Sequence, residues 1–76
     1  MNKELFNLQK RKDYAEIMHL FKYFYKDAWA PESIFAGKSR SWVKAFNNLI
    51  EKGFIEKQQK YPGTTYRWKA VWPDNF

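Results

Sequence analysis

The apolar spacing of the chain changes at Gly53, and this change constrains the fold more than any other feature of the sequence. Before the glycine, apolar residues recur at the three- and four-residue spacing of an amphipathic helix: Trp42, Phe46, Leu49 and Ile50. After it, residues 54–60 (FIEKQQK) alternate as a strand does. Glycine readily adopts the left-handed conformation that ends helices, so the pattern predicts a helix over residues 39–52 followed by a strand.

Two further helices are predicted upstream. Residues 13–26 carry large apolar side chains at helical spacing: Tyr14, Ile17, Met18, Phe21, Phe24 and Tyr25. Asp13, with Glu16 three residues later, forms a capping-box pattern that predicts the start of this helix. Proline is favoured at the first position of a helix, so Pro31 predicts a short second helix that ends near Gly37.

The C-terminal part predicts a second strand. Residues 66–72 (YRWKAVW) alternate, with Tyr66, Trp68, Ala70 and Trp72 on one face. Between the two strands, Pro62 and Gly63 suit the central positions of a type II turn. An isolated hairpin is only marginally stable, so we expect it to pack on the helices. The predicted fold class is α+β, with three helices followed by a two-stranded β-hairpin.

Composition shows how a chain of 76 residues can form a core and which functions it disfavours. It has seven Phe, five Tyr and four Trp, and each packed ring buries about 150–250 Å². The chain has no Cys, which excludes disulfides and thiolate metal sites. Its one histidine, His19, cannot form a metal site alone. No nucleotide-binding loop, carboxylate pair or nucleophile–base set is visible, so we expect neither an enzyme nor a small-molecule cofactor.

No apolar run approaches the roughly 18 residues that a membrane-spanning helix needs. The first 13 residues (MNKELFNLQKRKD) lack the apolar core of a secretory signal peptide. We therefore expect a soluble, cytoplasmic protein without a membrane partner.

The positive charge is concentrated in residues 38–69. This window holds eight basic residues against Glu51 and Glu56, whereas the rest of the chain balances six bases with six acids. The eight bases are Lys38, Arg40, Lys44, Lys52, Lys57, Lys60, Arg67 and Lys69. The formal net charge of +6 therefore lies entirely in this window, and a localised excess of this kind is typical of a protein with a polyanionic partner.

The segment from Trp29 to Trp72 resembles a winged helix-turn-helix domain. The resemblance is carried by APESIFAGKSRSWVKAFNNLIEKGFIEKQ, followed by a turn and YRW. It implies that residues 13–76 form this domain and that residues 1–12 are an N-terminal extension. It also implies that the third helix lies in the major groove of double-stranded DNA, while the hairpin, or wing, contacts the backbone or the minor groove. The function implied is that of a small transcriptional regulator.

The candidate DNA-binding residues lie in two groups. On and just before the third helix they are Lys38, Ser39, Arg40, Ser41, Lys44, Asn47 and Asn48, and on the hairpin they are Lys57, Lys60, Tyr61, Arg67 and Lys69. Arginine pairs bidentately with guanine and asparagine with adenine. The positive helix N-terminus suits a phosphate, and the cations of the hairpin suit phosphate contacts that position the protein without reading sequence.

Several alternatives remain open from the sequence. The polar stripe of the third helix is also what any solvated helix shows. The same basic face would suit an acidic protein partner, as in a winged helix that serves protein interaction. Exposed rings on basic strands would suit single-stranded nucleic acid or RNA. A homodimer is possible through residues 1–12, through the C-terminal VWPDNF, or through Trp29 and Trp72.

Overall fold

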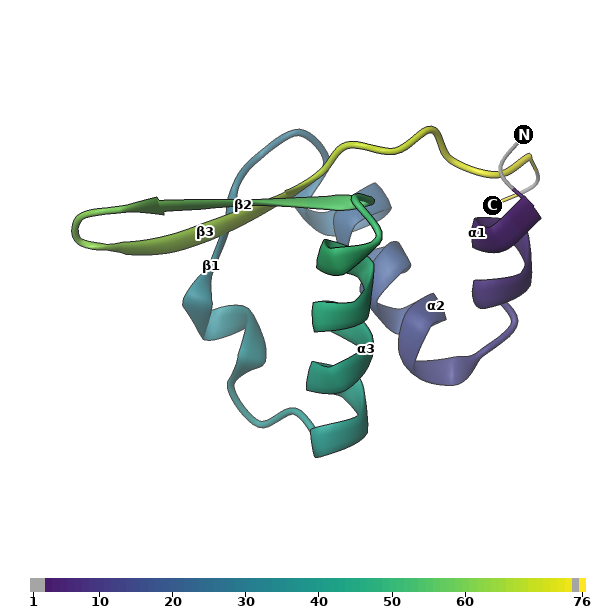
Figure 1. Ribbon diagram of the computed structural model, residues 1–76, viewed down its shortest axis with the longest axis horizontal. Coiled ribbons are helices and arrows are strands. Elements are labelled where there is room, and N and C mark those ends of the chain that lie inside the picture. The colour runs from purple at the N-terminus through teal and green to yellow at the C-terminus, as the bar shows by residue number, and fades with distance from the viewer. Residues whose placement is uncertain (1–2, 75) are drawn as a thin grey trace.

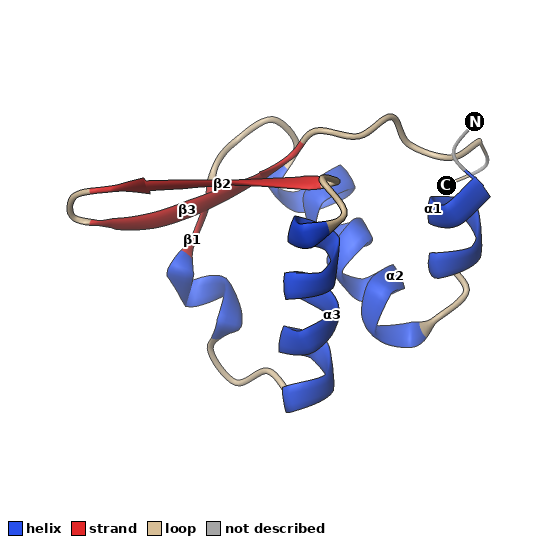
Figure 2. Cartoon of the chain, viewed as in Figure 1, coloured by secondary structure: helices blue, strands red, loops and turns tan. Residues whose placement is uncertain are grey.

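The fold comes from a computed structural model that describes residues 3–74 and 76. Helices form one part of the molecule, and a small antiparallel sheet extends from the other part (Figures 1 and 2). In chain order the elements are α1 (Lys3–Leu8), α2 (Lys12–His19), the π-helix η1 (Leu20–Tyr25), β1 (Ala30–Pro31), the 3₁₀-helix η2 (Glu32–Phe35), α3 (Arg40–Glu51), β2 (Ile55–Lys60) and β3 (Gly63–Trp68). The predicted α+β class is confirmed, and the order of elements is consistent with a winged-helix-like topology.

The sheet has three strands in the order β1-β3-β2, whereas the sequence predicted two. The additional strand is β1, in which Ala30 pairs with Tyr66 and Pro31 with Thr65. Pro31 was predicted to open the second helix, and η2 starts one residue later instead. Proline lacks a backbone N–H, so it is tolerated in an edge strand such as β1, which pairs on one side only.

The helix predicted over residues 13–26 is present from Lys12 to Tyr25, but its start differs from the prediction. Arg11 is the N-cap residue, and no side chain caps the helix. The prediction of a capping box formed by Asp13 and Glu16 is therefore wrong. Asp13 instead lies in the first turn, where a negative charge is favourable beside the positive end of the helix dipole.

The second half of this helix is the π-helix η1, and this changes which side chains face inward. Phe21 is fully buried and Tyr25 packs against the core, but Phe24 is 72% exposed. A π-helix has more residues per turn than an α-helix. The residue three positions after Phe21 is therefore rotated away from the core. The prediction that Phe24 belongs to the buried face is wrong for this reason.

The core is a cluster of rings and aliphatic side chains between the helices and the inner face of the sheet. Phe46 of α3 lies at its centre, with ring centroids 4.8 Å from Phe35, 5.1 Å from Tyr66 and 5.9 Å from Phe21. Leu5 and Leu8 of α1 are also buried in this cluster. Helix α1 is thus packed on the rest of the chain.

Helix α3 starts and ends where the sequence predicts. The Ser39 hydroxyl accepts a hydrogen bond from the Trp42 backbone N–H at 3.2 Å, so Ser39 is the N-cap. After the helix, Gly53 has a φ of +83°, the left-handed conformation expected of it. These two residues set the length of the helix that carries the candidate site.

The two ends of the hairpin differ from the prediction. Lys60 pairs with Gly63, so Tyr61 and Pro62 form the loop. Their peptide bond is cis. The prediction of a type II turn with Pro62 and Gly63 at its centre is therefore wrong, because Gly63 already belongs to β3. Strand β3 ends at Trp68 rather than continuing to Trp72. Beyond Trp68 the chain runs on toward α1 without strand pairing (Figure 1), the Trp72 ring stacks on the Trp68 ring at 4.3 Å, and the Trp68 indole N–H donates to the Ala70 carbonyl.

We expect Ser39→Ala to lower the free energy of unfolding by about 1 kcal/mol, because an N-cap hydroxyl satisfies a backbone N–H that is otherwise unpaired. Urea denaturation followed by circular dichroism measures this loss. Ser33→Ala is the matched control, since Ser33 is exposed on η2. An equal effect of the two substitutions would contradict the capping role of Ser39.

Candidate nucleic-acid interface

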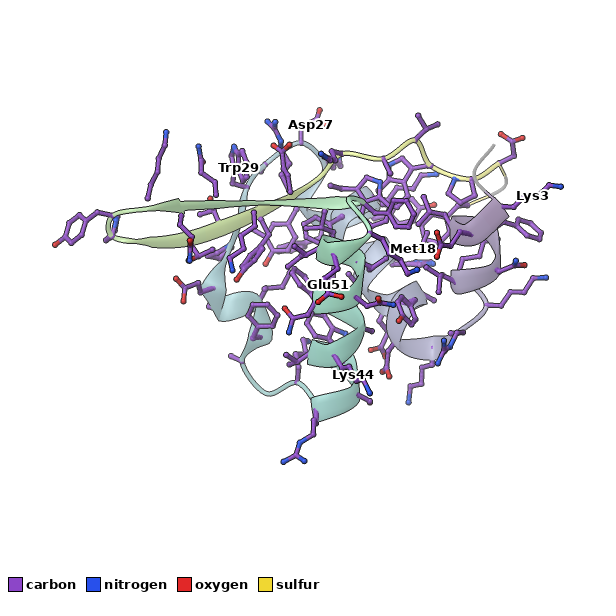
Figure 3. All side chains as sticks on the ribbon, in the orientation of Figure 1. Lys3, Met18, Asp27, Trp29, Lys44 and Glu51 are labelled. Atoms are coloured by element: carbon purple, nitrogen blue, oxygen red, sulfur yellow. The ribbon has the colours of Figure 1, made fainter. Side chains whose placement is uncertain are left out.

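Helix α3 presents a polar stripe on the side opposite the core. Trp42, Ala45, Phe46 and Leu49 are buried, and the exposed side chains at i, i+4, i+7 and i+11 are Arg40, Lys44, Asn47 and Glu51. Figure 3 labels two of them, Lys44 and Glu51, which lie two turns apart on α3. Among the described residues, Arg40, Lys44 and Asn47 form no side-chain hydrogen bond or ion pair within the chain. These three side chains are therefore available to a ligand.

The stripe borders an open groove of about 880 Å³ between α3 and the start of α2. The groove is lined by Arg40, Ser41, Lys44, Asn47, Asn48 and Glu51 from α3, and by Arg11, Lys12, Asp13 and Tyr14 from the start of α2. Arg11 and Lys12 are exposed and were not among the residues predicted from sequence. The signal that marks them is the run Lys10-Arg11-Lys12, because it directly precedes a helix that packs on α3.

Two predicted residues of α3, Asn48 and Ser41, make side-chain contacts within the chain. The Asn48 side-chain amide donates to the Tyr14 hydroxyl at 2.7 Å, which links α3 to α2. The Ser41 hydroxyl lies 3.1 Å from that of the N-cap residue Ser39. Asn48 and the two serines therefore lie beside the polar stripe with at least part of their hydrogen-bonding capacity satisfied within the chain.

Lys38, just before α3, lies on a different side of the helix start from Arg40. Its ammonium group is 5.3 Å from the centre of the Trp42 ring, a cation–π contact. Lys52, just after α3, forms an ion pair with Glu4 of α1. Hydrogen bonding to Glu4 and the negative charge of Glu4 raise the pKa of Lys52. Lys52 is thus occupied in joining α3 to α1.

The register of the hairpin separates the predicted cations of the wing. Lys57 is paired with the buried Tyr66, so it lies on the core-facing side of the sheet. Arg67 is paired with Glu56 and lies on the opposite side, as does Lys60. Tyr61, at the tip of the hairpin, is fully exposed.

Arg67 is engaged within the sheet. Its guanidinium forms a 2.7 Å ion pair with Glu56 and lies 4.5 Å from the centre of the Trp29 ring. Lys69 follows the end of β3 and lines a small hollow with Lys26 and Asp27, which is not part of the groove beside α3. The structure therefore brings the predicted residues of α3 together and leaves Arg67 and Lys69 outside that group.

Tyr66 of β3 is buried between the hairpin and the helices, and its phenol allows a test by pH. Burial and the negative charge of Glu32 raise the pKa of Tyr66 above its ordinary 10.0. The unfolded chain therefore releases this proton at a lower pH than the folded chain. The associated stability is fully present below pH 10.0 and falls as the pH rises through the raised pKa. We expect Tyr66→Phe to lose stability less steeply above pH 10.0 than the wild type.

Urea unfolding at a series of alkaline pH values measures this difference. The matched control is Tyr61→Phe, because Tyr61 is fully exposed. Its alkaline loss of stability should equal that of the wild type. If Tyr66→Phe follows the wild-type curve as well, the buried phenol does not contribute to the alkaline loss.

Comparisons of the chain with known protein families, with curated proteins and with solved structures find no match. Within residues 3–74 and 76, no helix has the length and apolar character needed to cross a membrane. In the same part of the chain, no group of three or more His, Cys, Asp or Glu side chains could hold a metal ion.

Proposed function

We propose that this chain is a winged helix-turn-helix protein that binds double-stranded DNA with sequence preference and regulates transcription. One observation carries the proposal: Arg40, Lys44 and Asn47 project from a single stripe of α3 without partners among the described residues. Arg11 and Lys12 add two exposed cations beside that stripe. A groove lined in this way suits a ligand with a regular array of negative charge.

The side chains of the stripe match the chemistry of base edges in the major groove. Arg40 can donate two hydrogen bonds to a guanine, and Asn47 can both donate to and accept from an adenine. Lys44, Arg11 and Lys12 would neutralise phosphates on either side of the helix. Phosphate contacts set the position of α3, and the contacts of Arg40 and Asn47 then distinguish one sequence from another.

The hairpin provides the second contact in this proposal. Strands β2 and β3 extend away from the helices (Figure 1), with exposed Lys57 in the middle of β2 and exposed Lys60 and Tyr61 at the far end, Lys57 and Lys60 on opposite faces of the sheet. Because these cations lie on the hairpin and not on α3, they would reach the DNA backbone beyond the major groove that α3 occupies. Arg67 has a different role, because its ion pair with Glu56 and its contact with Trp29 stabilise the outer face of the sheet.

Selection from random duplex DNA, followed by a salt titration of the selected sequence, tests the proposal. We expect an enriched motif, and the logarithm of its binding constant should fall with the logarithm of salt with a slope of about −4 to −5. This slope corresponds to roughly five cations that neutralise phosphates. The five are Arg11, Lys12, Lys44, Lys57 and Lys60. If the motif is a palindrome with half-sites one helical turn apart, two copies of the chain bind side by side.

Two results would oppose the proposal. One is the absence of any enriched motif together with a salt slope near zero. The other is tighter binding to single strands than to duplex of the same sequence, which would favour stacking of bases on exposed rings such as Tyr61.

A further inference from the structure

A second groove, of about 810 Å³, lies between the α2–η1 helix and the start of α3. Apolar surface in this groove comes from Ala15 of α2, Leu20 of η1 and Trp42 of α3. Tyr23 and Phe24 of η1 also line it and are 55% and 72% exposed. Most of the surface of this groove is therefore apolar.

The π-helix is the structural cause of this surface. In a regular α-helix Phe24 would lie near the buried face that Ile17 and Phe21 define. In η1 it is turned outward, and its one close ring contact within the described residues is with the neighbouring Tyr25, at 4.9 Å. A π-helical turn is rare and is found frequently at functional sites. The Phe24 ring is thus exposed beside the groove and is not buried in the core.

Two lysines border the apolar surface. Lys12 and Lys38 line the groove. Glu16 is the one carboxylate that lines the groove within the described residues. A ligand that fits both the rings and this rim carries apolar side chains flanked by carboxylates. A second copy of the chain fits poorly, because each copy has a net charge of +6.

We propose that this groove binds an acidic amphipathic helix of a partner protein. The apolar side of such a helix, with anchors at i, i+3 or i+4 and i+7, would lie against Phe24, Leu20 and Trp42. Its Asp or Glu side chains would meet Lys12 and Lys38. The groove does not include Arg40, Lys44 or Asn47, so a partner bound here leaves that stripe accessible to DNA, although Lys12 lines both grooves and would be shared between the two ligands.

The test is a selection from a phage-displayed library of random 16-residue peptides against the full chain, followed by fluorescence anisotropy with the enriched peptides. We expect apolar residues at helical spacing, flanked by Asp or Glu. Phe24→Ala should weaken binding of these peptides about tenfold or more, as expected for loss of a buried ring. Lys38→Glu should weaken it severalfold. The matched controls are Val71→Ala, which removes another apolar side chain that is 82% exposed, and Lys57→Glu, and both should change binding less than twofold.

Several outcomes would overturn the proposal. Enriched peptides without acidic residues would do so, as would equal effects of Phe24→Ala and Val71→Ala. Self-association that disappears in Phe24→Ala, measured by sedimentation, would assign the groove to a second copy. Loss of single-stranded DNA binding in the same variant would assign it to nucleic acid. Duplex DNA affinity should be unchanged in Phe24→Ala, so failure of this proposal is distinguishable from failure of the DNA-binding function.

Discussion

Phe46→Ala is expected to lower the free energy of unfolding by about 3–5 kcal/mol, the usual effect of removing a buried phenylalanine ring. Phe46 is fully buried and contacts rings from three other parts of the fold: Phe21, Phe35 and Tyr66. A chain of this size is stable by only about 4–11 kcal/mol, at 0.05–0.15 kcal/mol per residue. The substitution therefore removes a large share of the stability, and urea denaturation followed by circular dichroism measures it.

Phe24→Ala makes the same chemical change 22 positions earlier and is the matched control. Phe24 is 72% exposed, so its removal should change the stability by no more than about 0.5 kcal/mol. Equal losses in the two variants would mean that Phe24 packs in the core, as a regular helix would place it. A loss below about 1 kcal/mol for Phe46→Ala would mean that the ring cluster does not hold the helices to the sheet.

Helix α3 was predictable because local chemistry determines it. The spacing of Trp42, Phe46 and Leu49 requires one apolar face, Ser39 supplies the N-cap, and Gly53 supplies the left-handed residue that follows. Each of these signals acts within a few residues of the position it controls. The exposed stripe of Arg40, Lys44 and Asn47 follows from the same spacing, so the central part of the candidate site was predicted as well.

The remaining differences depend on contacts between distant residues. Strand β1 exists because Ala30 meets Tyr66, a pairing over 36 positions that a two-residue strand cannot signal by itself. Phe24 points outward in a helix whose buried ring, Phe21, packs against Trp68 and Phe46, both of which are distant in sequence. The ion pair of Arg67 with Glu56 depends on the register of the hairpin, which the Tyr61-Pro62 loop sets. Spacing along the sequence contains none of this information.

The joint change Arg40→Glu and Lys44→Glu is expected to weaken binding to the selected duplex by about 100-fold or more near 100 mM salt. Loss of a bidentate contact to guanine accounts for about 1–3 kcal/mol. Reversal of two charges beside the phosphates adds repulsion to that loss. The salt slope should also become shallower by about 1 for the lost contact of Lys44. Both side chains are exposed and unpaired among the described residues, so the fold should be retained, which circular dichroism checks.

The matched control is Lys3→Glu with Lys69→Glu, which alters the net charge by the same amount, from +6 to +2. Both lysines are exposed. Lys3 lies at the outer end of α1 (Figure 3), and Lys69 lines a hollow apart from the groove of α3. If only the net charge of the protein determines its affinity for DNA, the two double variants bind the selected duplex equally weakly. If α3 contacts the bases, the control retains most of its affinity and the selected motif. In that case Asn47→Ala should relax the preference at one base position while leaving the salt slope unchanged, because a base contact releases no counterion.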